Sequence, residues 1–180
     1  MVEERLLRIK LLAMDVDGVL TKGDVIYEDD GAEYKVFNIM DGLGITVAGH
    51  AGLLTAFVTG RKSGAVARRA KELKVTALCD GCQDKGTAIR NLRSKFSLSA
   101  DEIAFVGDDI NDIPAFRESG LRIAVSNASD DLKAHADIIT NCSGGNGAIR
   151  EVIEMILKAQ GKWSSAVECY LRELESAGKA

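Results

Sequence analysis

The sequence predicts a doubly wound α/β fold, in which helices cover both faces of a Rossmann-like parallel sheet. Short apolar, β-branched runs recur along the chain, and each is followed by a polar or glycine-containing turn. After each turn, apolar residues recur three and four positions apart, which is the spacing of a helix packed on a sheet. The 180 residues, 46% hydrophobic and 28% charged, are typical of one globular domain. Successive strand–helix units of this kind build a parallel sheet.

The expected elements follow this alternation in order. The predicted strands are Leu7–Met14, Leu53–Val58, Val75–Leu78, Ile103–Val106, Leu121–Val125 and a short strand near Ile138. The predicted helices are Ala65–Leu73, Gly86–Phe96, Asp112–Glu118 and Gly147–Ala159.

One segment after the first strand departs from the alternation. Two β-rich runs, 25–27 and 34–37, flank the sequence Glu-Asp-Asp-Gly, which contains an Asp-Gly turn signal at Asp30 and Gly31. We therefore expect a hairpin insert over about 23–37. Residues 1–162 are expected to form a single domain, followed by a C-terminal tail over 163–180. The tail places apolar side chains on one possible helical face and is too short to be stable alone, so it should pack on something, such as a neighbouring subunit.

Charge and cysteine content narrow the class of protein. The net charge is -4 and no run of Lys or Arg exceeds two residues, which argues against nucleic acid and against an anionic membrane surface as partners. Arg8 and Lys10 interrupt the apolar N-terminal stretch, which is therefore read as a strand of a cytoplasmic protein. The four cysteines are expected to be reduced, and the CxxC pair Cys79 and Cys82 is read as structural.

Polar residues follow four of the predicted strands, where ligands collect in an open parallel sheet. Two carboxylates two positions apart, Asp15 and Asp17, end the first strand. Asp15 is suited to attack phosphorus while Asp17 handles the proton of the leaving or entering oxygen. Carboxylates repel a phosphate dianion, so a hard cation is needed, and Asp15 and Asp108 at the end of the fourth strand are candidate Mg2+ ligands.

Further residues at the same edge complete the candidate site. Thr59 and Gly60 end the second strand, and Lys85 opens the helix after the third, so these groups can hold phosphate oxygens. Asp109 and Asp112 either orient the ligands of the metal or cap the helix that follows. Three acidic residues at one crevice without a cation would be electrostatically costly, which favours a metal site.

These residues predict a metal-dependent phosphatase, and two other classes of protein have to be compared with it. A signalling receiver domain also carries acids, a Thr and a Lys at strand ends, but its acceptor Asp lies on a separate strand from the first acidic pair, whereas here the paired acids come first. In a catalytically silent oligomerisation module, the polar residues at the strand ends would be expected to be substituted, and all of them are present here.

The motifs resemble those of the haloacid dehalogenase superfamily of phosphatases. The matching segments, in order, are 15–21 (Asp-Val-Asp-Gly-Val-Leu-Thr), 59–61 (Thr-Gly-Arg), Lys85 and 107–112 (Gly-Asp-Asp-x-x-Asp). The resemblance implies that Asp15 forms an aspartyl-phosphate and that the backbone carbonyl of Asp17 also contacts the magnesium. It further implies that Thr59 and Lys85 bind the phosphate.

A closer resemblance is to the 3-deoxy-D-manno-octulosonate 8-phosphate phosphatase family. It rests on the hairpin insert and on segments 37–45, 59–62 and 144–151, and it places Asn38, Asp41 and Gly42 among the substrate-binding residues. It implies hydrolysis of this sugar acid phosphate in lipopolysaccharide precursor synthesis, with no separate cap domain. It also implies a homotetramer in which the hairpin and C-terminal tail close neighbouring active sites.

The sequence departs from this family where a substrate carboxylate would be recognised. The positions of Met40, Thr46 and Asn146 are often basic in the family and are neutral here. A guanidinium fork suits a carboxylate, which leaves Arg61 and Arg69 as candidates, unless these are solvated helix residues. Relatives that hydrolyse sialic acid 9-phosphates share the scaffold, so a nine-carbon sugar acid phosphate is the alternative substrate.

Overall fold

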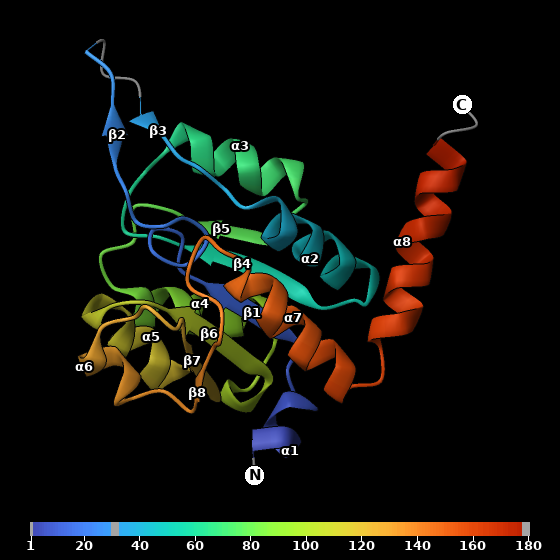
Figure 1. Ribbon diagram of the computed structural model, residues 1–180. Helices are drawn as coiled ribbons and strands as arrows, with labels where there is room; N and C mark the ends of the chain where they lie inside the picture. The colour runs from blue at the N-terminus through green and yellow to red at the C-terminus, as the bar shows by residue number, and fades with distance from the viewer. Residues whose placement is uncertain (1, 30–32, 178–180) are drawn as a thin grey trace.

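A six-stranded sheet forms the centre of the computed structural model, which describes residues 2–29 and 33–177 (Figure 1). All its neighbouring strands run parallel, in the order β5-β4-β1-β6-β7-β8. The strands are β1 (Leu11–Met14), β4 (Leu54–Val58), β5 (Ala77–Cys79), β6 (Ile103–Gly107), β7 (Leu121–Ala124) and β8 (Ile138–Ile139). The doubly wound α/β prediction is confirmed.

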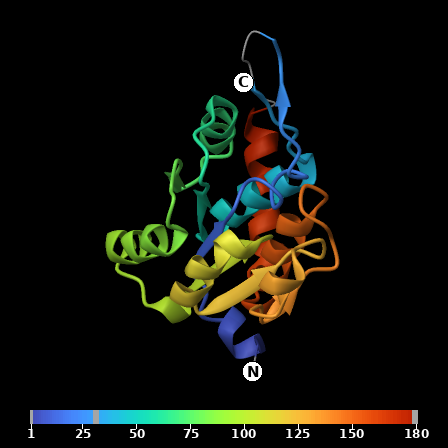
Figure 2. The same ribbon diagram turned by 90° about the vertical axis from the view of Figure 1, so that its left-hand side faces the viewer.

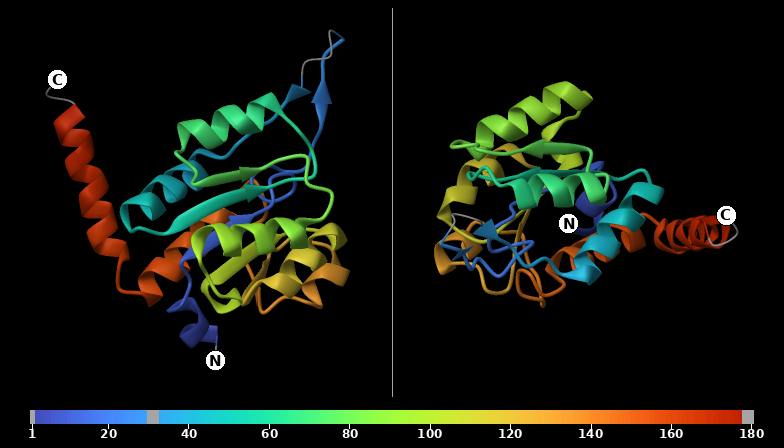
Figure 3. Two further views of the ribbon diagram at one scale, coloured as in Figure 1. Left: turned by 180° about the vertical axis from the view of Figure 1, so that it is seen from behind. Right: turned by 90° about the horizontal axis from the view of Figure 1, so that it is seen from above.

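Helices lie on both faces of the sheet. They are α1 (Val2–Leu6), α2 (Ile39–His50), α3 (Gly64–Glu72), α4 (Lys85–Phe96), α5 (Ile113–Glu118), α6 (Asp130–Lys133), α7 (Ala148–Ala159) and α8 (Trp163–Ala177). Helix α2 packs against α7, and α4 packs against α5. Figures 2 and 3 show these two pairs on opposite sides of the sheet.

The register of the central strands brings the site residues to one edge. Met14, the last residue of β1, pairs with Phe57 of β4 on one side and with Val106 of β6 on the other. All three side chains are fully buried. Because the strands are parallel, the polar residues that follow them emerge together at the carboxyl edge of the sheet.

Helix α2 and the start of β1 differ from the sequence prediction. The first strand begins at Leu11 rather than Leu7, because α1 and a turn occupy the preceding residues. Helix α2 was not predicted, since it contains three glycines and is apolar on most of its surface. One of these glycines has a packing reason: a Cβ on Gly42 would lie 2.2 Å from Nη2 of Arg69 on α3. Tertiary packing thus overrides the low helix propensity of glycine.

The predicted hairpin and tail helix are both present. Strands β2 (Ile26–Tyr27) and β3 (Glu33–Tyr34) pair antiparallel, whereas the predicted turn residues Asp30 and Gly31 lie outside the described residues. Helix α8 packs against α2 and α7 and extends away from the sheet (Figure 1). Among the described residues, no helix has the length and apolar character needed to cross a membrane.

Candidate active site

The carboxylates of Asp15, Asp108 and Asp112 meet beyond the ends of β1 and β6. One oxygen from each lies within 4.8 Å of the oxygens of the other two. Asp15 follows β1 directly and is 4% exposed, while Asp112 is completely buried. The backbone N–H of Asp108 donates to Oδ2 of Asp112 at 2.9 Å, which ties the loop after β6 to the buried carboxylate.

Gly18 permits the close approach of the loops after β1 and β6. Its φ of 88° is in the region that favours glycine, and a Cβ there would lie 2.0 Å from Oδ2 of Asp108. A side chain at this position would therefore displace Asp108 from the cluster.

Lys85 supplies a positive charge to the acidic cluster. It is the first residue of α4, and its Nζ lies 2.9 Å from Oδ2 of Asp15 and 2.5 Å from Oδ1 of Asp112. Burial opposes the charged form of Lys85, but the two carboxylates outweigh it and raise the pKa of the ammonium. Lys85 therefore remains charged between Asp15 and Asp112.

The carboxylates of the cluster resist ionising together. Burial, followed by the charge of Asp112, raises the pKa of Asp15 to about 6, although Lys85 opposes the change. Burial and the charges of Asp15 and Asp112 raise the pKa of Asp108 to about 8. The cluster thus has more negative charge than Lys85 can neutralise, and its all-oxygen donor set fits a hard divalent cation such as Mg2+.

Asp109 and Asp112 make different contacts at this edge of the sheet, and their proposed influence on the metal stays a prediction. Asp109 accepts a hydrogen bond from the N–H of Ile110 at 2.8 Å and caps the short 3-10 helix Ile110–Asp112. Asp112 instead lies between Lys85 and the backbone of Asp108, where it orients both groups.

Thr59 reaches the crevice from the end of β4. Its N–H donates to the carbonyl of Cys79 at 2.9 Å, so this donor is already used by the protein. Its Oγ1 accepts from the N–H of Arg61 at 3.3 Å, which leaves the hydroxyl proton to donate elsewhere. A cavity of about 270 Å³ is lined by Thr59, Gly60 and Arg61 together with Asp15, Asp17, Lys85 and Asp108.

Asp17 is contacted by a residue that the sequence analysis missed. Lys35, just after β3, forms an ion pair through Nζ with Oδ1 of Asp17 and a second one with Glu33 at 3.3 Å. Glu33 also contacts Nη2 of Arg61 at 3.1 Å, and Arg61 donates to the hydroxyl of Tyr27 at 2.7 Å. Glu33 and Lys35 share one face of an extended segment, a spacing that could have pointed to them.

Asn38, Asp41 and Gly42 are not brought to the crevice of their own chain. Asn38 caps α2 by accepting from the N–H of Met40 at 2.7 Å. Asp41 is buried and accepts from the N–H groups of Gly147 at 3.2 Å and Arg150 at 2.8 Å at the start of α7. These contacts give both residues a structural role, and their assignment to substrate stays a prediction.

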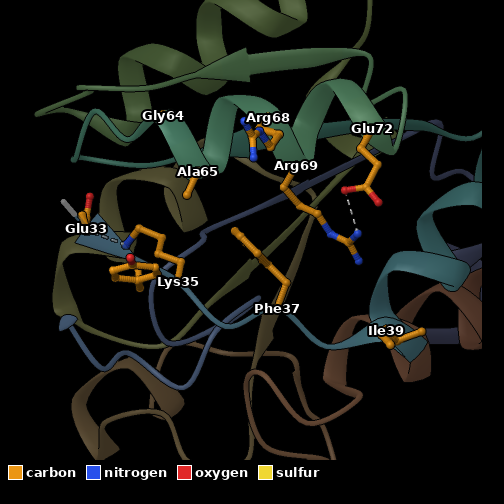
Figure 4. Close-up of a pocket in the computed structure, with 10 residues that line it drawn as sticks. Glu33, Lys35, Phe37, Ile39, Gly64, Ala65, Arg68, Arg69 and Glu72 are labelled. Atoms are coloured by element: carbon orange, nitrogen blue, oxygen red, sulfur yellow. Dashed lines mark ion pairs between the residues drawn. The ribbon is translucent and has the colours of Figure 1, made fainter. Parts of the chain in front are cut away.

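Arg69 lies in a second, larger cavity between the hairpin and α3, of about 680 Å³ (Figure 4). Its guanidinium forms an ion pair with Glu72 at 3.0 Å and lies 5.8 Å from the centre of the Phe37 ring. Lys35 also lines this cavity, so the hairpin residue lies between the two cavities.

The comparisons with known proteins agree with this geometry. Residues 79–153 match the family model of haloacid dehalogenase-like hydrolases. The 3-deoxy-D-manno-octulosonate 8-phosphate phosphatase KdsC of Escherichia coli K12 is 40% identical over 158 residues, 88% of this chain and 84% of that protein. The Haemophilus influenzae KdsC is 36% identical over 98% of this chain and 99% of its own. The chain belongs to the 3-deoxy-D-manno-octulosonate 8-phosphate phosphatase family.

Solved structures support the same family assignment. The phosphatase of this family from Moraxella catarrhalis, in complex with a magnesium ion, a phosphate ion and a KDO molecule, superposes with a TM-score of 0.90. It is 42% identical, and the match covers 94% of this chain and 97% of that one. A cobalt-bound family member from H. influenzae gives a TM-score of 0.86 at 39% identity, covering 89% and 94% of the two chains.

Proposed function

We propose that this chain is a magnesium-dependent phosphatase that hydrolyses 3-deoxy-D-manno-octulosonate 8-phosphate to the free sugar acid and phosphate, in lipopolysaccharide precursor synthesis. The observation that carries the proposal is the cluster of Asp15, Lys85 and Asp108 at the sheet edge. It occurs in a fold whose M. catarrhalis relative is in complex with magnesium, phosphate and KDO.

The proposed reaction has two steps on Asp15. Its carboxylate oxygen attacks phosphorus and forms an aspartyl-phosphate, while the bond from phosphorus to the sugar oxygen breaks and Asp17 protonates that oxygen. Water then attacks the aspartyl-phosphate and gives its proton to Asp17. Phosphate is released, and Asp15 and Asp17 return to their starting forms.

Residues around Asp15 orient the phosphate. The Lys85 ammonium, the Thr59 hydroxyl and the N–H of Gly60 are the proposed donors to its oxygens. Asp15, Asp108 and the backbone carbonyl of Asp17 would hold Mg2+. When bound, the ion offsets the repulsion between carboxylates and phosphate and stabilises the charge that develops during transfer.

Recognition of the sugar acid is assigned to groups on and near the hairpin. Arg61 lines the catalytic cavity, while Arg69 lines the adjacent one, and a guanidinium is suited to a carboxylate. Asn38, Asp41 and Gly42 remain candidates for contact with a substrate held by a neighbouring chain.

We also propose a homotetramer in which hairpins and C-terminal tails close neighbouring sites. Large apolar side chains of the hairpin and the start of α2 are exposed, including Tyr27 at 63%, Val36 at 73% and Ile39 at 83%. Apolar surface of this kind is typical of an interface. In this proposal residues 1–162 form the catalytic domain, 163–180 form the tail, and the cytoplasmic location suggested by the sequence stays a prediction. Light scattering tests the assembly, and a fully active monomer would contradict it.

The substrate is tested by phosphate release from a panel of purified esters in the presence of Mg2+. Octulosonate 8-phosphate, sialic acid 9-phosphates and simple sugar phosphates are compared by kcat/KM, with Asp15→Asn as the matched inactive control. We expect a clear preference for octulosonate 8-phosphate and no turnover by the control. Preference for a nine-carbon substrate would replace the substrate assignment but keep the chemistry.

A further inference from the structure

A buried lysine of the hairpin contacts the proposed acid and base of its own chain. The Lys35 side chain is 1% exposed, and its Nζ lies between Oδ1 of Asp17 and Oε1 of Glu33. Figure 4 shows Lys35 extending from the hairpin towards Glu33. An ammonium loses much hydration when it is buried, so two carboxylate partners are needed to keep it there.

The contacts continue from Lys35 to the turn after β4. Glu33 pairs with Arg61, and the backbone N–H of Arg61 donates to the hydroxyl of Thr59. Negative and positive groups therefore alternate from Asp17 through Lys35 and Glu33 to Arg61. A hairpin with two-residue strands is weak by itself, and this chain of ion pairs attaches it to two strand ends of the catalytic crevice.

We propose that Lys35 is a positioning residue for Asp17, and that the hairpin supplies it in cis. By donating to Oδ1, the ammonium restricts the rotation of the Asp17 carboxyl group, so that the second oxygen, Oδ2, carries the proton to the leaving oxygen and later takes one from water. The hairpin thus acts on the chemistry of its own chain, in addition to any role in assembly. This inference rests on the proposed function, because it assumes that Asp17 protonates the leaving oxygen.

The leaving group provides a readout that a purely structural role would not change. Phenyl phosphate and p-nitrophenyl phosphate have nearly the same shape, but phenolate is the more basic leaving group and depends more on a proton donor. Neither ester carries a sugar, so a contact between Lys35 and the sugar acid would not affect their ratio. A change in the fraction of folded enzyme would affect both esters equally and cancel.

The experiment measures kcat/KM for both esters, and for octulosonate 8-phosphate, with Lys35→Met and wild type. General acid catalysis contributes about 10²- to 10⁴-fold to the rate. If the Asp17 carboxyl group is only partly misplaced in Lys35→Met, kcat/KM should fall about tenfold more for phenyl phosphate than for p-nitrophenyl phosphate. Lys35→Arg should recover part of this loss. Lys10→Met is the matched control, because Lys10 is distant from the crevice and pairs with Glu102 at 2.5 Å.

A phenyl to p-nitrophenyl ratio within about twofold of wild type in Lys35→Met would overturn the proposal. So would a loss confined to octulosonate 8-phosphate, which would make Lys35 a sugar contact. If the Met variant does not fold, Lys35→Gln, which keeps an N–H donor but no charge, is compared in the same way. A wild type that releases phosphate from none of the three esters would refute the proposed function itself.

Discussion

The stability of the metal-free protein should fall as the pH rises, and Asp108→Asn should remove most of this dependence. In the folded protein the pKa of Asp108 is about 8, against a usual value of 3.8, because of burial and the charges of Asp15 and Asp112. A group with a raised pKa in the folded state contributes stability at low pH that is lost as the pH rises through the folded value. The relevant window here runs from about pH 4 to pH 8.

The size of the effect follows from the pKa of Asp108. Each pH unit below that value changes the free energy of unfolding by about 1.4 kcal/mol. Between pH 5 and pH 8 the wild type should therefore lose up to about 4 kcal/mol that the Asn variant does not lose. Asp15, whose pKa is about 6, adds to the loss only near the lower end of this range.

Magnesium should stabilise the wild type and leave Asp108→Asn nearly unchanged. A ligand at a hundredfold excess over its Kd stabilises the folded state by about 2.7 kcal/mol. In a chain of this size that corresponds to an increase in Tm of roughly 5–10 °C. Asp108→Asn lacks one proposed ligand and should show little or no increase.

Urea unfolding of both proteins at pH 5 and pH 8, in EDTA and in Mg2+, measures the pH dependence of the free energy of unfolding and the stabilisation by Mg2+. The difference between wild type and Asp108→Asn at each pH cancels the contribution of titrating groups outside the cluster of Asp15, Asp108, Asp112 and Lys85. If the free energies of unfolding of wild type and Asp108→Asn fell equally between pH 5 and pH 8 in EDTA, the electrostatic reasoning would be refuted. Equal stabilisation of both proteins by Mg2+ would refute the role of Asp108 in metal binding.

Three further variants test individual contacts. Gly18→Ala should lose most magnesium-dependent activity, because its Cβ would displace Asp108, and a normal kcat would contradict this. Asp41→Ala should lower the free energy of unfolding by about 1–2 kcal/mol through loss of the cap on α7, and an unchanged urea midpoint would count against it. Burial opposes the charge of Asp137, but hydrogen bonds from Arg122 and Arg5 hold its pKa well below the usual value. Asp137→Asn should therefore lower the free energy of unfolding by about 2 kcal/mol at pH 7. This cost should shrink below about pH 4, where the unfolded chain binds a proton at Asp137 that the folded protein resists; a cost that does not change with pH would contradict this.

The sequence predicted the sheet and the placement of the proposed catalytic residues because both depend on local patterns. Buried β-branched runs mark the strands, and the parallel arrangement places the residues after them at one edge. Asp15, Lys85 and Asp108 could therefore be assigned to one crevice before any contact between them was known.

The missed features depend on contacts between distant segments. Helix α2 was missed because its glycines are selected by close packing, as with Gly42 against Arg69, and not by helix propensity. Lys35 was missed because the spacing of Glu33 and Lys35 indicates only that they share one face of the hairpin, and nothing in the sequence indicates that this face folds back onto Asp17. Asp41 was assigned to substrate by resemblance, while in this chain its carboxylate accepts hydrogen bonds from the first turn of α7.

The central claim is that Asp15 carries the phosphoryl group during turnover. Asp17→Asn removes the proposed base for hydrolysis of the aspartyl-phosphate, and p-nitrophenyl phosphate, whose leaving group depends little on a proton donor, still allows the intermediate to form. The variant is mixed with p-nitrophenyl phosphate and Mg2+, quenched in acid, and the peptide that contains Asp15 is examined by mass spectrometry. The account predicts one added phosphoryl group on Asp15, absent in EDTA. Steady release of phosphate with no labelled Asp15 at any time point, in this variant or in wild type, would contradict it.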